Sequence, residues 1–270
     1  MAQKIWFITG ASRGFGRIWA QAALERGDRV AATVRHLGAL DELRNRYGDA
    51  VLPLELDVTD RAAVFATVGQ AHAHFGRLDV VVSAAGYGLL GAIEEVSIED
   101  TRSNVETNLF GTLNVIQAVL PLLRRQGSGH ILPVTSTSGL IGIPTSGIYT
   151  ATKFAVEGLA ESLAAEVAGL GIKVTLIEPG PFRTNFGNAV TYGTPIADYD
   201  PIREMLNGLL TPEAFGDPEA TAKAILKLVD TDEPPLRLML GMMLPFVRDT
   251  YAQRITEWEA WDDVARAAQG

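Results

Sequence analysis

Short apolar runs alternate along the chain with longer segments in which apolar residues recur every three or four positions. The short runs carry almost no charge, as strands do when helices cover both faces of a sheet. They predict seven strands, at residues 4–9, 29–34, 51–57, 78–83, 130–136, 172–178 and 236–240. The longer segments predict helices at residues 14–26, 39–46, 60–75, 98–126, 148–170, 218–229 and 246–267.

A strand, a crossover and a second strand, repeated along one chain, indicate a parallel sheet, because each right-handed crossover has to pass over one face. The prediction is a Rossmann-like, doubly wound α/β sandwich with a seven-stranded, mainly parallel sheet and helices on both faces. We expect residues 1–270 to form one domain. Residues 187–216 are the one long loop-like region and the expected lid over a cleft. Pro133 falls inside a predicted strand, for which a bulge is the expected explanation.

The composition excludes several classes of protein. The chain of 270 residues is 47% hydrophobic and 20% charged, which is typical of a globular protein. Its formal net charge of −9 argues against nucleic acid as a partner. It has no cysteine, and its four histidines lack ligand spacing, so we expect no metal site. The chain shows neither a secretion signal nor a run long enough to cross a bilayer, which predicts a cytoplasmic protein without a membrane partner.

The first predicted strand runs into a glycine-rich turn, TGASRGFG, directly before a predicted helix. Backbone N–H groups and the helix dipole point at such a turn and favour a bound anion, such as the pyrophosphate of a dinucleotide. A tight strand-to-helix turn without a ligand is the alternative. The residues of this turn that we expect to bind a cofactor are Gly10, Ser12, Arg13, Gly14, Phe15 and Gly16.

The end of the third predicted strand offers a second cofactor contact. There the carboxylate of Asp57 could accept a hydrogen bond from an adenine amino group, with the backbone of Val58 beside it. A helix cap is the alternative role for Asp57, although Thr59 or Asp60 suits that role better.

The end of the second predicted strand bears on the choice of cofactor. It has no acid to hold a ribose 2′-hydroxyl, and Arg35 stands there instead. Arg35 and Arg13 together would bind a 2′-phosphate through charge-assisted hydrogen bonds. This pattern predicts NADP(H) as the preferred cofactor, with NAD(H) possible. Two ordinary surface arginines are the alternative.

The segment YTATK places Tyr149 four residues before Lys153 in a predicted helix, so that their polar ends can reach the same small volume. A tyrosine with a pKa near 10 is a poor acid or base at neutral pH, and a neighbouring cation favours its phenolate. We therefore expect Lys153 to lower the pKa of Tyr149, and Tyr149 to act as a general acid or base. A solvated surface turn is the alternative.

In chain order, the motifs TGASRGFG, SAAG, ETNLFG, VTSTSG, YTATK and EPGPFRT resemble those of the short-chain dehydrogenase/reductase family in its single-domain form, over nearly the whole chain. The resemblance implies a tetrad of Asn108, Ser136, Tyr149 and Lys153, with NAD(P) laid across the carboxyl ends of the strands. Ser136 would donate to the substrate carbonyl oxygen, and Ser138 is the competing candidate. Asn108 would hold a water in a proton relay to the lysine, while an amide bonding locally in a helix is the alternative.

The resemblance also extends the site beyond the glycine turn. Further expected cofactor contacts are Ala84, Gly86, Tyr149, Lys153, Pro179, Gly180 and Thr184. The expected substrate contacts are Ser136, Tyr149, Tyr87, Ile141, Phe182 and Phe186. Ordinary core packing is the alternative for the apolar members, whose character favours an uncharged, lipophilic substrate. The family commonly has two asparagines where SAAG has serine and alanine, so we expect a weaker sheet or weaker cofactor binding here.

These inferences predict an NADP(H)-dependent oxidoreductase that interconverts a ketone or aldehyde and an alcohol. The alternative is a non-catalytic NADP(H)-binding sensor of the same fold, although a sensor has no use for a proton-transfer couple. The family habit of pairing two long helices with a symmetry mate predicts a homodimer or homotetramer. A C-terminal tail containing Trp258 and Trp261 could instead cover that surface.

Overall fold

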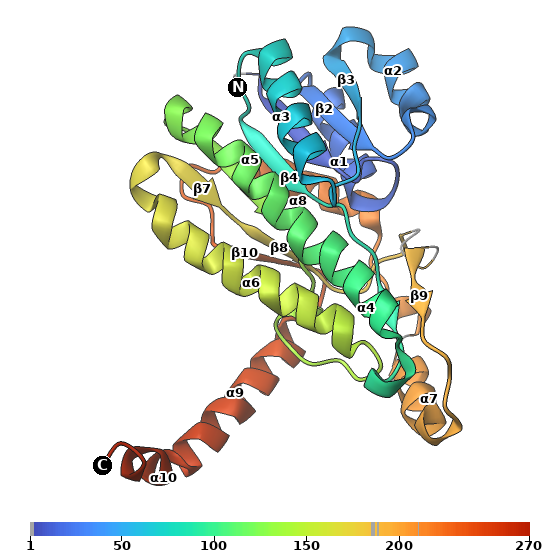
Figure 1. Ribbon diagram of the computed structural model, residues 1–270, viewed down its shortest axis with the longest axis vertical. Helices are drawn as coiled ribbons and strands as arrows, with labels where there is room; N and C mark the ends of the chain where they lie inside the picture. Colours follow the sequence, from blue (N-terminus) through green and yellow to red (C-terminus); the bar gives the residue numbers. More distant parts are fainter. Residues whose placement is uncertain (1–2, 185–186, 188, 210) are drawn as a thin grey trace.

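The computed structural model describes residues 3–184, 187, 189–209 and 211–270, and a parallel sheet runs through its centre (Figure 1). The main sheet has six strands in the order β3-β2-β1-β4-β6-β7. Its strands are β1 (Ile5–Thr9), β2 (Arg29–Val34), β3 (Val51–Glu55), β4 (Val80–Ser83), β6 (Gly129–Pro133) and β7 (Ile172–Val174). Two further parallel pairs join β8 (Leu176–Pro179) to β10 (Arg237–Leu240) and β5 (Leu89–Leu90) to β9 (Thr191–Tyr192).

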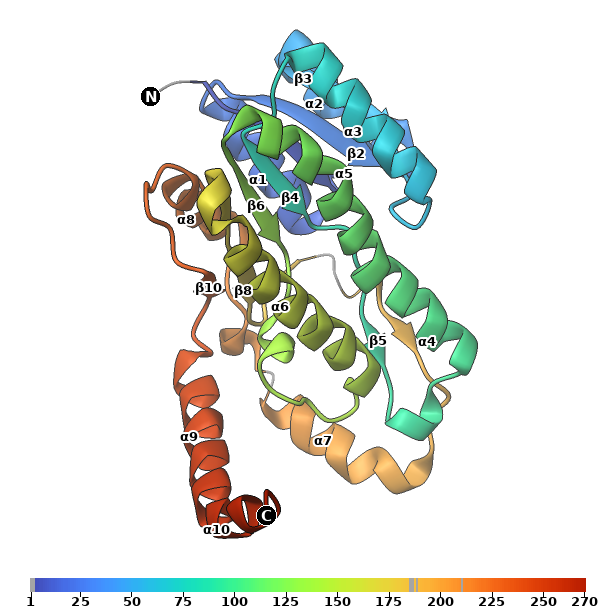
Figure 2. The same cartoon turned by 60° about the vertical axis from the view of Figure 1, so that its left-hand side comes forward.

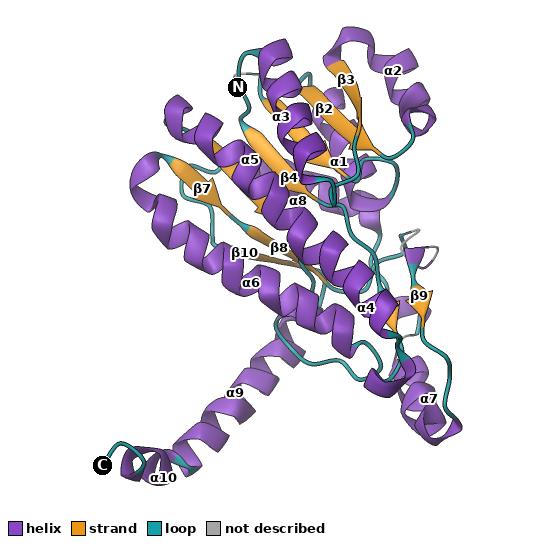
Figure 3. Cartoon of the chain, viewed as in Figure 1, coloured by secondary structure: helices purple, strands orange, loops and turns teal. Residues whose placement is uncertain are grey.

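Helices cover both faces of the main sheet, as Figure 3 shows. Alternate residues of β1 divide between two cores, because Trp6 and Ile8 pack on one face while Phe7 packs on the other. The first face is covered by α1 (Gly14–Glu25), α2 (Asp41–Tyr47) and α8 (Thr221–Val229). The second is covered by α3 (Arg61–Phe75), α5 (Gly111–Gln126) and α6 (Gly147–Val167). The predicted doubly wound sandwich is confirmed.

Pro133 occupies the last position of β6 without a bulge. It pairs with Ser83 in the same register as the rest of β6 and β4, so the expected bulge is wrong. The N–H groups of His130 and Val134 both point to β4. Because N–H groups alternate along a strand, residue 133 faces the opposite neighbour, where proline has no proton to donate.

The strand next to β6 on the side away from β4 is divided at Thr175 into β7 and β8, although a single strand was predicted for residues 172–178. Its register against β6 is unchanged across the division, since Ile131 pairs with Val174 and Val134 with Ile177. The division lies where the parallel pattern would require a hydrogen bond from Pro133. Beyond it, β8 pairs with β10 on its other edge, so the main sheet has six strands instead of the predicted seven.

The helix predicted at residues 98–126 is interrupted. It consists of α4 (Ile98–Val105), a π-helical turn (Glu106–Phe110) and α5. Gly111 ends the turn by donating its N–H to the carbonyl of Glu106. A Cβ on Gly111 would lie 2.6 Å from Cγ2 of Val58, so the backbone approaches the end of β3 as only glycine permits.

The predicted lid region contains more regular structure than a loop. Its described part includes β9 and α7 (Asp200–Leu209), and α7 was not predicted. A signal was present, because Ile202, Met205, Leu206 and Leu209 recur at helical spacing. Met205 and Leu209 are nevertheless 50% and 67% exposed, so this apolar stripe is only partly covered.

Glu95 ties the lid region to the segment that follows β4. Its side chain is 1% exposed, and its carboxylate receives Arg203 Nη1 of α7 at 2.6 Å. The same carboxylate accepts the backbone N–H groups of Ala92 at 2.6 Å and Ile196 at 2.7 Å. One buried charge therefore fixes both the turn before it and the approach to α7.

The C-terminal helices extend away from the body of the molecule (Figures 1 and 2). They are α9 (Leu244–Ala260) and α10 (Asp262–Ala267), where one helix was predicted. Near the start of α9, Val247 is buried, and further along the helix Arg254 Nη1 donates to the carbonyl of Leu140 at 3.1 Å. Trp258 and Trp261 are 68% and 67% exposed. No helix in the described part of the chain is long and apolar enough to cross a membrane.

Candidate active site

The glycine turn lies where the strand order reverses, between the carboxyl ends of β1 and β4. Gly10 has a positive φ of 71°, and a Cβ there would lie 2.9 Å from the backbone nitrogen of Ala85. A Cβ on Gly16 would lie 2.5 Å from the carbonyl oxygen of Gly10. Arg13 is the N-cap of α1 and makes no side-chain cap, which leaves the first N–H groups of that helix to other partners. This cradle of bare backbone fits a pyrophosphate.

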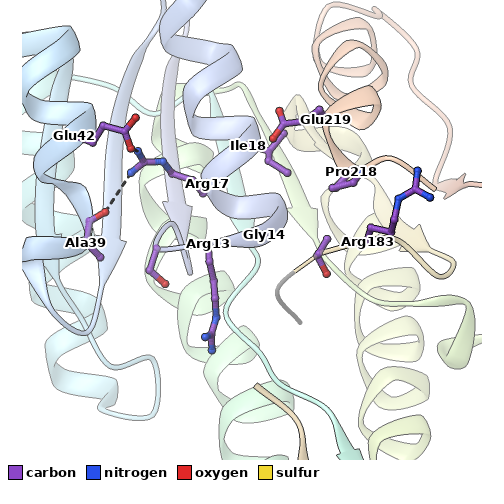
Figure 4. A pocket seen from close by; sticks show the side chains of 11 residues that line it. Arg13, Gly14, Arg17, Ile18, Ala39, Glu42, Arg183, Pro218 and Glu219 are labelled. Carbon is purple, nitrogen blue, oxygen red and sulfur yellow. Dashed lines mark hydrogen bonds and ion pairs between the residues drawn. The ribbon is translucent and has the colours of Figure 1, made fainter. Parts of the chain in front are cut away.

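A pocket of about 370 Å³ opens beside this cradle (Figure 4). Four of the predicted cofactor residues line it, namely Ser12, Arg13, Gly14 and Thr184. Arg35 is exposed and is not among the lining residues. Arg17 and Arg183 are, and neither was predicted. Arg17 could have been found, because it lies in the first turn of the helix that follows the glycine turn.

The three arginines of the pocket differ in their partners. Arg17 lies 2.6 Å from Glu42 Oε2 and donates to the carbonyl of Ala39 at 3.2 Å, whereas the Arg13 side chain extends away from them (Figure 4). Arg13 is exposed, and Arg183 reaches the carbonyl of Pro212 at 3.5 Å. Glu42 therefore balances the charge of Arg17, while Arg13 remains accessible to a ligand.

Asp57 and Val58 follow the end of β3. The carboxylate of Asp57 accepts the N–H and the hydroxyl of Thr59 at 2.9 Å and 2.8 Å, so it closes a local turn. Asp60 caps α3 through the N–H of Ala63, which confirms the preference for Asp60 over Asp57 as the cap. Val58 is buried, and its carbonyl accepts Asn114 Nδ2 at 3.0 Å.

The four residues of the expected tetrad form a connected group: Asn108 and Lys153 flank Gly86, and Tyr149 links Lys153 to Ser136. A Cβ on Gly86 would lie 2.9 Å from Asn108 Oδ1 and 3.7 Å from Lys153 Nζ. Lys153 Nζ lies 5.5 Å from the centroid of the Tyr149 ring, and Ser136 is hydrogen-bonded to Tyr149. Asn108 and Lys153 are buried, whereas Ser136 and Tyr149 are partly exposed. The two residues that reach the surface, Ser136 and Tyr149, thus have two buried polar residues, Lys153 and Asn108, behind them.

The side-chain amide of Asn108 is held at both ends by its neighbours. Its Oδ1 accepts the N–H of Tyr87 at 3.0 Å, and its Nδ2 donates to the carbonyl of Tyr87 at 3.0 Å. Nδ2 also contacts Asn104 Oδ1 at 3.1 Å and Thr152 Oγ1 at 3.3 Å. Because Asn108 lies in the π-helical turn, this side chain crosses from that helix to both the β4 loop and α6.

Burial dominates the protonation of the tyrosine and the lysine. It raises the pKa of Tyr149 to about 12, although the hydrogen bond with Ser136 acts in the opposite direction. It lowers the pKa of Lys153 to about 8, although the carboxylate of Glu157 opposes this. The expected lowering of the Tyr149 pKa by Lys153 is therefore wrong for this structure. Lys153 Nζ instead lies over the ring and donates to the carbonyl of Val134 at 3.0 Å.

Ser136 is presented by the turn that follows β6. Its Oγ accepts the N–H of Ser138 at 3.1 Å and lies 3.4 Å from the carbonyl oxygen of Pro179. Ser136 is hydrogen-bonded to Tyr149, which favours it over Ser138 as the serine of the site. The contact with Pro179 also brings the predicted serine to the predicted turn at the end of β8.

The turn at Pro179 and Gly180 is closely packed against the end of β10 and the residues that follow it. Gly180 donates its N–H to the carbonyl of Leu240 at 2.9 Å, and a Cβ on Gly180 would lie 2.8 Å from Met243 Cγ. Thr184 donates its N–H to the carbonyl of Phe182 at 2.8 Å. The Pro-Gly exit from β8 thus brings Thr184 back to the pocket at α1.

Other hydroxyl groups brace the SAAG segment. Thr9 Oγ1 accepts the N–H groups of Ala84 and Ala85 at 3.1 Å and 3.2 Å. Ser83 Oγ donates to Thr112 Oγ1 at 3.3 Å, and Thr112 Oγ1 in turn donates to the carbonyl of Asn108 at 2.9 Å. These bonds tie β4 to β1 and to α5, so the reduced stability expected from the missing asparagines is partly offset.

The expected substrate contacts do not all lie at the tetrad. Tyr87 is half-buried at the tetrad, and burial raises its pKa. Ile141 is 1% exposed in a cluster with Val247 of α9, and the Phe182 ring meets the Phe15 ring edge-on at 5.4 Å. These packing contacts favour the core alternative for Ile141 and Phe182. Phe15 also stacks on Trp19, with ring centroids 5.2 Å apart. Phe186 lies outside the described residues.

Comparisons with known proteins agree with this geometry. The family model for short chain dehydrogenases matches residues 4–193. An oxidoreductase of Botryotinia fuckeliana is 43% identical over 88% of this chain and 89% of its own. The 3-ketodihydrosphingosine reductase of Bacteroides thetaiotaomicron is 38% identical over 94% of this chain and 92% of its own. The chain belongs to the short-chain dehydrogenase/reductase family. It is therefore an oxidoreductase that acts on alcohol and carbonyl groups.

Solved structures of this family share the fold. A short-chain dehydrogenase from Streptomyces avermitilis has a TM-score of 0.91 and 38% identity, with 99% of this chain and 98% of that chain covered. An alcohol dehydrogenase of Thermococcus sibiricus, complexed with 5-hydroxy-NADP, has a TM-score of 0.75, 29% identity and coverage of 89% and 97%. A family member of Burkholderia phymatum, in complex with NAD, has a TM-score of 0.80, 25% identity and coverage of 91% and 92%.

The described part of the chain offers no group of three or more histidine, aspartate or glutamate side chains that could hold a metal ion. The site consists instead of a glycine cradle, an arginine-lined pocket and a cluster of one phenol, one amine, one hydroxyl and one amide. These groups can hold a dinucleotide and move a proton next to it.

Proposed function

We propose that this short-chain dehydrogenase/reductase reduces a lipophilic ketone or aldehyde with NADPH, with Tyr149 as the proton donor. The observation that carries the proposal is the connected group of Asn108, Lys153, Tyr149 and Ser136, which starts at Gly86 in a chain that also has a glycine cradle fit for a dinucleotide. A bound nicotinamide would supply the hydride that adds to the carbonyl carbon. Tyr149 would then give its phenolic proton to the carbonyl oxygen, which completes the alcohol.

The protonation of the site supports reduction at neutral pH. Because burial raises the pKa of Tyr149 to about 12, its phenol keeps the proton that the carbonyl oxygen needs. Ser136 would donate to the same oxygen as its negative charge develops. With a pKa of about 8, Lys153 remains mostly an ammonium at pH 7 and would stabilise the phenolate left after transfer. Asn108 would hold a water that returns a proton through the lysine.

We infer NADP(H) as the preferred cofactor from the cations at the glycine turn and at the end of β2. Arg13 lines the pocket and is exposed, and Arg35 is exposed at the end of β2, where no acid occurs. Related proteins of known structure contain NADP or NAD, so both nucleotides suit the family cradle. A 2′-phosphate bound by two guanidinium groups would favour NADP(H) by about tenfold or more.

The double variant Arg13→Ala, Arg35→Ala tests this preference through KM for NADPH and for NADH. We expect the ratio of the two values to move at least about tenfold towards NADH. The matched control is Arg124→Ala, Arg125→Ala, which removes two exposed arginines at the far end of α5. An unchanged ratio in the first variant would exclude the two arginines as the cause of NADP selectivity.

The surroundings of the site support a lipophilic substrate. Tyr87 lies at the tetrad, and Leu90 pairs with Tyr192 of the lid region, in which Tyr192, Met205 and Leu209 are exposed. A related protein is named for reduction of 3-ketodihydrosphingosine, a long-chain ketone. Apolar side chains on a movable cover would gain contact area when such a chain binds beneath them.

A panel of ketones and aldehydes of increasing chain length tests the activity through the absorbance of NADPH. We expect turnover with lipophilic members, and a loss of at least about 100-fold in kcat for Tyr149→Phe, with NADPH binding unchanged. Tyr251→Phe, on α9, is the matched control. If NADPH binds but no member of the panel is turned over, the sensor alternative would replace the enzyme.

We also propose that the enzyme forms a homodimer or homotetramer through its long helices. Beyond Arg254, which lies over the Phe154 ring of α6, the C-terminal tail extends away from the body (Figure 2), which supports this assembly. Light scattering on the purified protein tests it, and the mass of a monomer would refute it. One domain, a lid over residues 187–216 and a cytoplasmic location stay predictions.

A further inference from the structure

A second group of charged side chains is buried behind the tetrad. On α6, Glu157 follows Lys153 by one helical turn, just as Lys153 follows Tyr149. The side chains of Glu157 and Glu178 are 6% and 1% exposed. Arg237 of β10 reaches both of them, with Nε 3.1 Å from Glu157 Oε2 and 3.4 Å from Glu178 Oε1. Nothing in the proposed chemistry requires acids at this place.

The carboxylate of Glu157 is bound directly to the strand end that carries the serine. Its Oε1 accepts the hydroxyl of Thr135 at 2.7 Å, and Thr135 immediately precedes Ser136. The backbone N–H of Thr135 is itself bonded to the carbonyl of Ile177 at 2.8 Å. The position of Ser136 thus depends on α6 through the hydroxyl of Thr135 and on β8 through the backbone N–H of Thr135, whose hydroxyl also lies 3.1 Å from the carbonyl oxygen of Ile177.

The turn after Ser136 packs on the same stretch of α6. A Cβ on Gly139 would lie 3.0 Å from Glu157 Cγ and 3.2 Å from the carbonyl oxygen of Lys153. Glycine is therefore what lets this turn contact the helix between the lysine and the glutamate. Glu157 is enclosed by the turn, by Thr135 and by Arg237, so its carboxylate has a single defined position.

We propose that Glu157 is a positioning residue of the active site, which fixes Ser136 through Thr135 and stabilises the ammonium of Lys153 by its negative charge. The proposal rests on the proposed function, because it assigns Glu157 to the reaction of the same tetrad. A second effect of Glu157 follows from the burial of Lys153. Burial lowers the pKa of Lys153 to about 8, and Glu157 acts against that lowering. Without its charge, Lys153 would lose its proton at a lower pH.

Burial raises the pKa of Glu157, and the hydrogen bond from Thr135 and the charge of Arg237 act against that rise and favour its carboxylate. Several other charged groups face it. They are Glu178 from β8, Arg237 from β10, and Glu161 and Lys153 from α6. Burial raises the pKa of Glu178 to about 8, so Glu178 keeps its proton at pH 7. Glu161 is exposed and binds Arg237 Nη2 at 2.7 Å. A purely structural role for the Glu157–Arg237 pair is the competing explanation.

The variant Glu157→Gln keeps the shape and removes the charge, and Glu161→Gln, which also loses a bond to Arg237, is its matched control. We measure kcat and KM for carbonyl reduction between pH 6 and pH 9. For Glu157→Gln we expect kcat to fall about tenfold or more while KM for NADPH stays within about twofold. We also expect the alkaline limb of the kcat profile to move down by about one pH unit. Glu161→Gln should change neither.

A second variant separates the two effects. Thr135→Val removes the hydrogen bond to Glu157 but keeps the carboxyl group, so kcat should fall. Because that bond also lowers the pKa of Glu157, the alkaline limb should move less than in Glu157→Gln. A lower melting temperature in Glu157→Gln, with an unchanged kcat and pH profile, would show a purely structural role and overturn the proposal.

The protonation of Lys153 can also be measured without turnover. The chain has only five lysines, so ¹³Cε-labelled lysine gives few signals, and Lys153→Arg assigns the one from the site. We expect its pKa to be lower in Glu157→Gln than in the wild type, and an unchanged pKa would overturn the electrostatic part. If the wild type turns over no substrate, the proposed function fails, whereas this titration still decides whether Glu157 controls the charge of Lys153.

Discussion

Replacing the buried His130 by glutamine should remove a loss of stability that the folded chain suffers in mild acid. His130 is 4% exposed in β6, and its Nε2 lies 2.9 Å from Thr175 Oγ1. That hydroxyl gives its own proton to the carbonyl of Pro235 at 2.7 Å, so Nε2 has to be the donor. Nδ1 is buried without a hydrogen-bond partner among the described residues. A second proton would therefore place an unpaired charge inside the sheet.

The size of the effect follows from the two pKa values. Burial lowers the pKa of His130 from 6.5 to about 3, with smaller contributions from Lys173 and Lys4. Because the folded pKa lies below the unfolded one, the unfolded chain takes up the proton first as the pH falls. The contribution to stability is complete above pH 6.5 and is lost towards pH 3. At 1.36 kcal/mol per unit, the loss between pH 7 and pH 5 is about 2 kcal/mol.

Urea denaturation at pH 7 and pH 5 measures this loss in the wild type and in His130→Gln. Glutamine keeps a donor for Thr175 but does not titrate, so the variant should lose about 2 kcal/mol less than the wild type on acidification. Glu178 has the opposite dependence, because its raised pKa favours the folded chain at low pH, and this term is common to both proteins. His74→Gln, at an exposed histidine, is the control. The reasoning is refuted if His130→Gln is as sensitive to acid as the wild type.

Three further substitutions test the site and the lid. Gly86→Ala should lower kcat about tenfold or more, because its Cβ would lie 2.9 Å from Asn108 Oδ1. Gly16→Ala should weaken NADPH binding about tenfold or more in calorimetry, because its Cβ would lie 2.5 Å from a backbone carbonyl oxygen of the cradle. Glu95→Gln should accelerate amide hydrogen exchange in residues 191–209, since the lid loses its buried anion.

Each of these substitutions has a matched control. Gly142→Ala and Gly69→Ala add a methyl group where no atom lies within 4 Å, and both should retain normal kinetics and NADPH binding. Glu99→Gln removes an exposed acid from the first turn of α4. Equal effects in a variant and its control would trace the change to general destabilisation. Wild-type behaviour of Gly86→Ala would contradict the close packing at the tetrad.

The order of strands and helices could be predicted from the sequence, because burial on both faces leaves a local record in the apolar pattern. The glycine turn and the YTATK spacing are equally local, and the structure brings both to the same end of the sheet. The prediction of continuous helices and strands failed where residues distant in the sequence meet. The π-helical turn needs the contact between Gly111 and Val58, and the division at Thr175 needs Pro133 on the neighbouring strand.

The sequence by itself determined the doubly wound fold and the glycine turn, since residue type and spacing along one element are sufficient for these, whereas the expected tetrad came from the resemblance to the family. Only the tertiary structure decided which arginines line the pocket, that Ile141 packs against α9, and that Glu157 lies behind Lys153. It also reversed the expected direction of the Tyr149 pKa. A pKa depends on how much water surrounds a group and on charges that arrive from distant segments, and neither quantity is recorded in the spacing of residues along the chain.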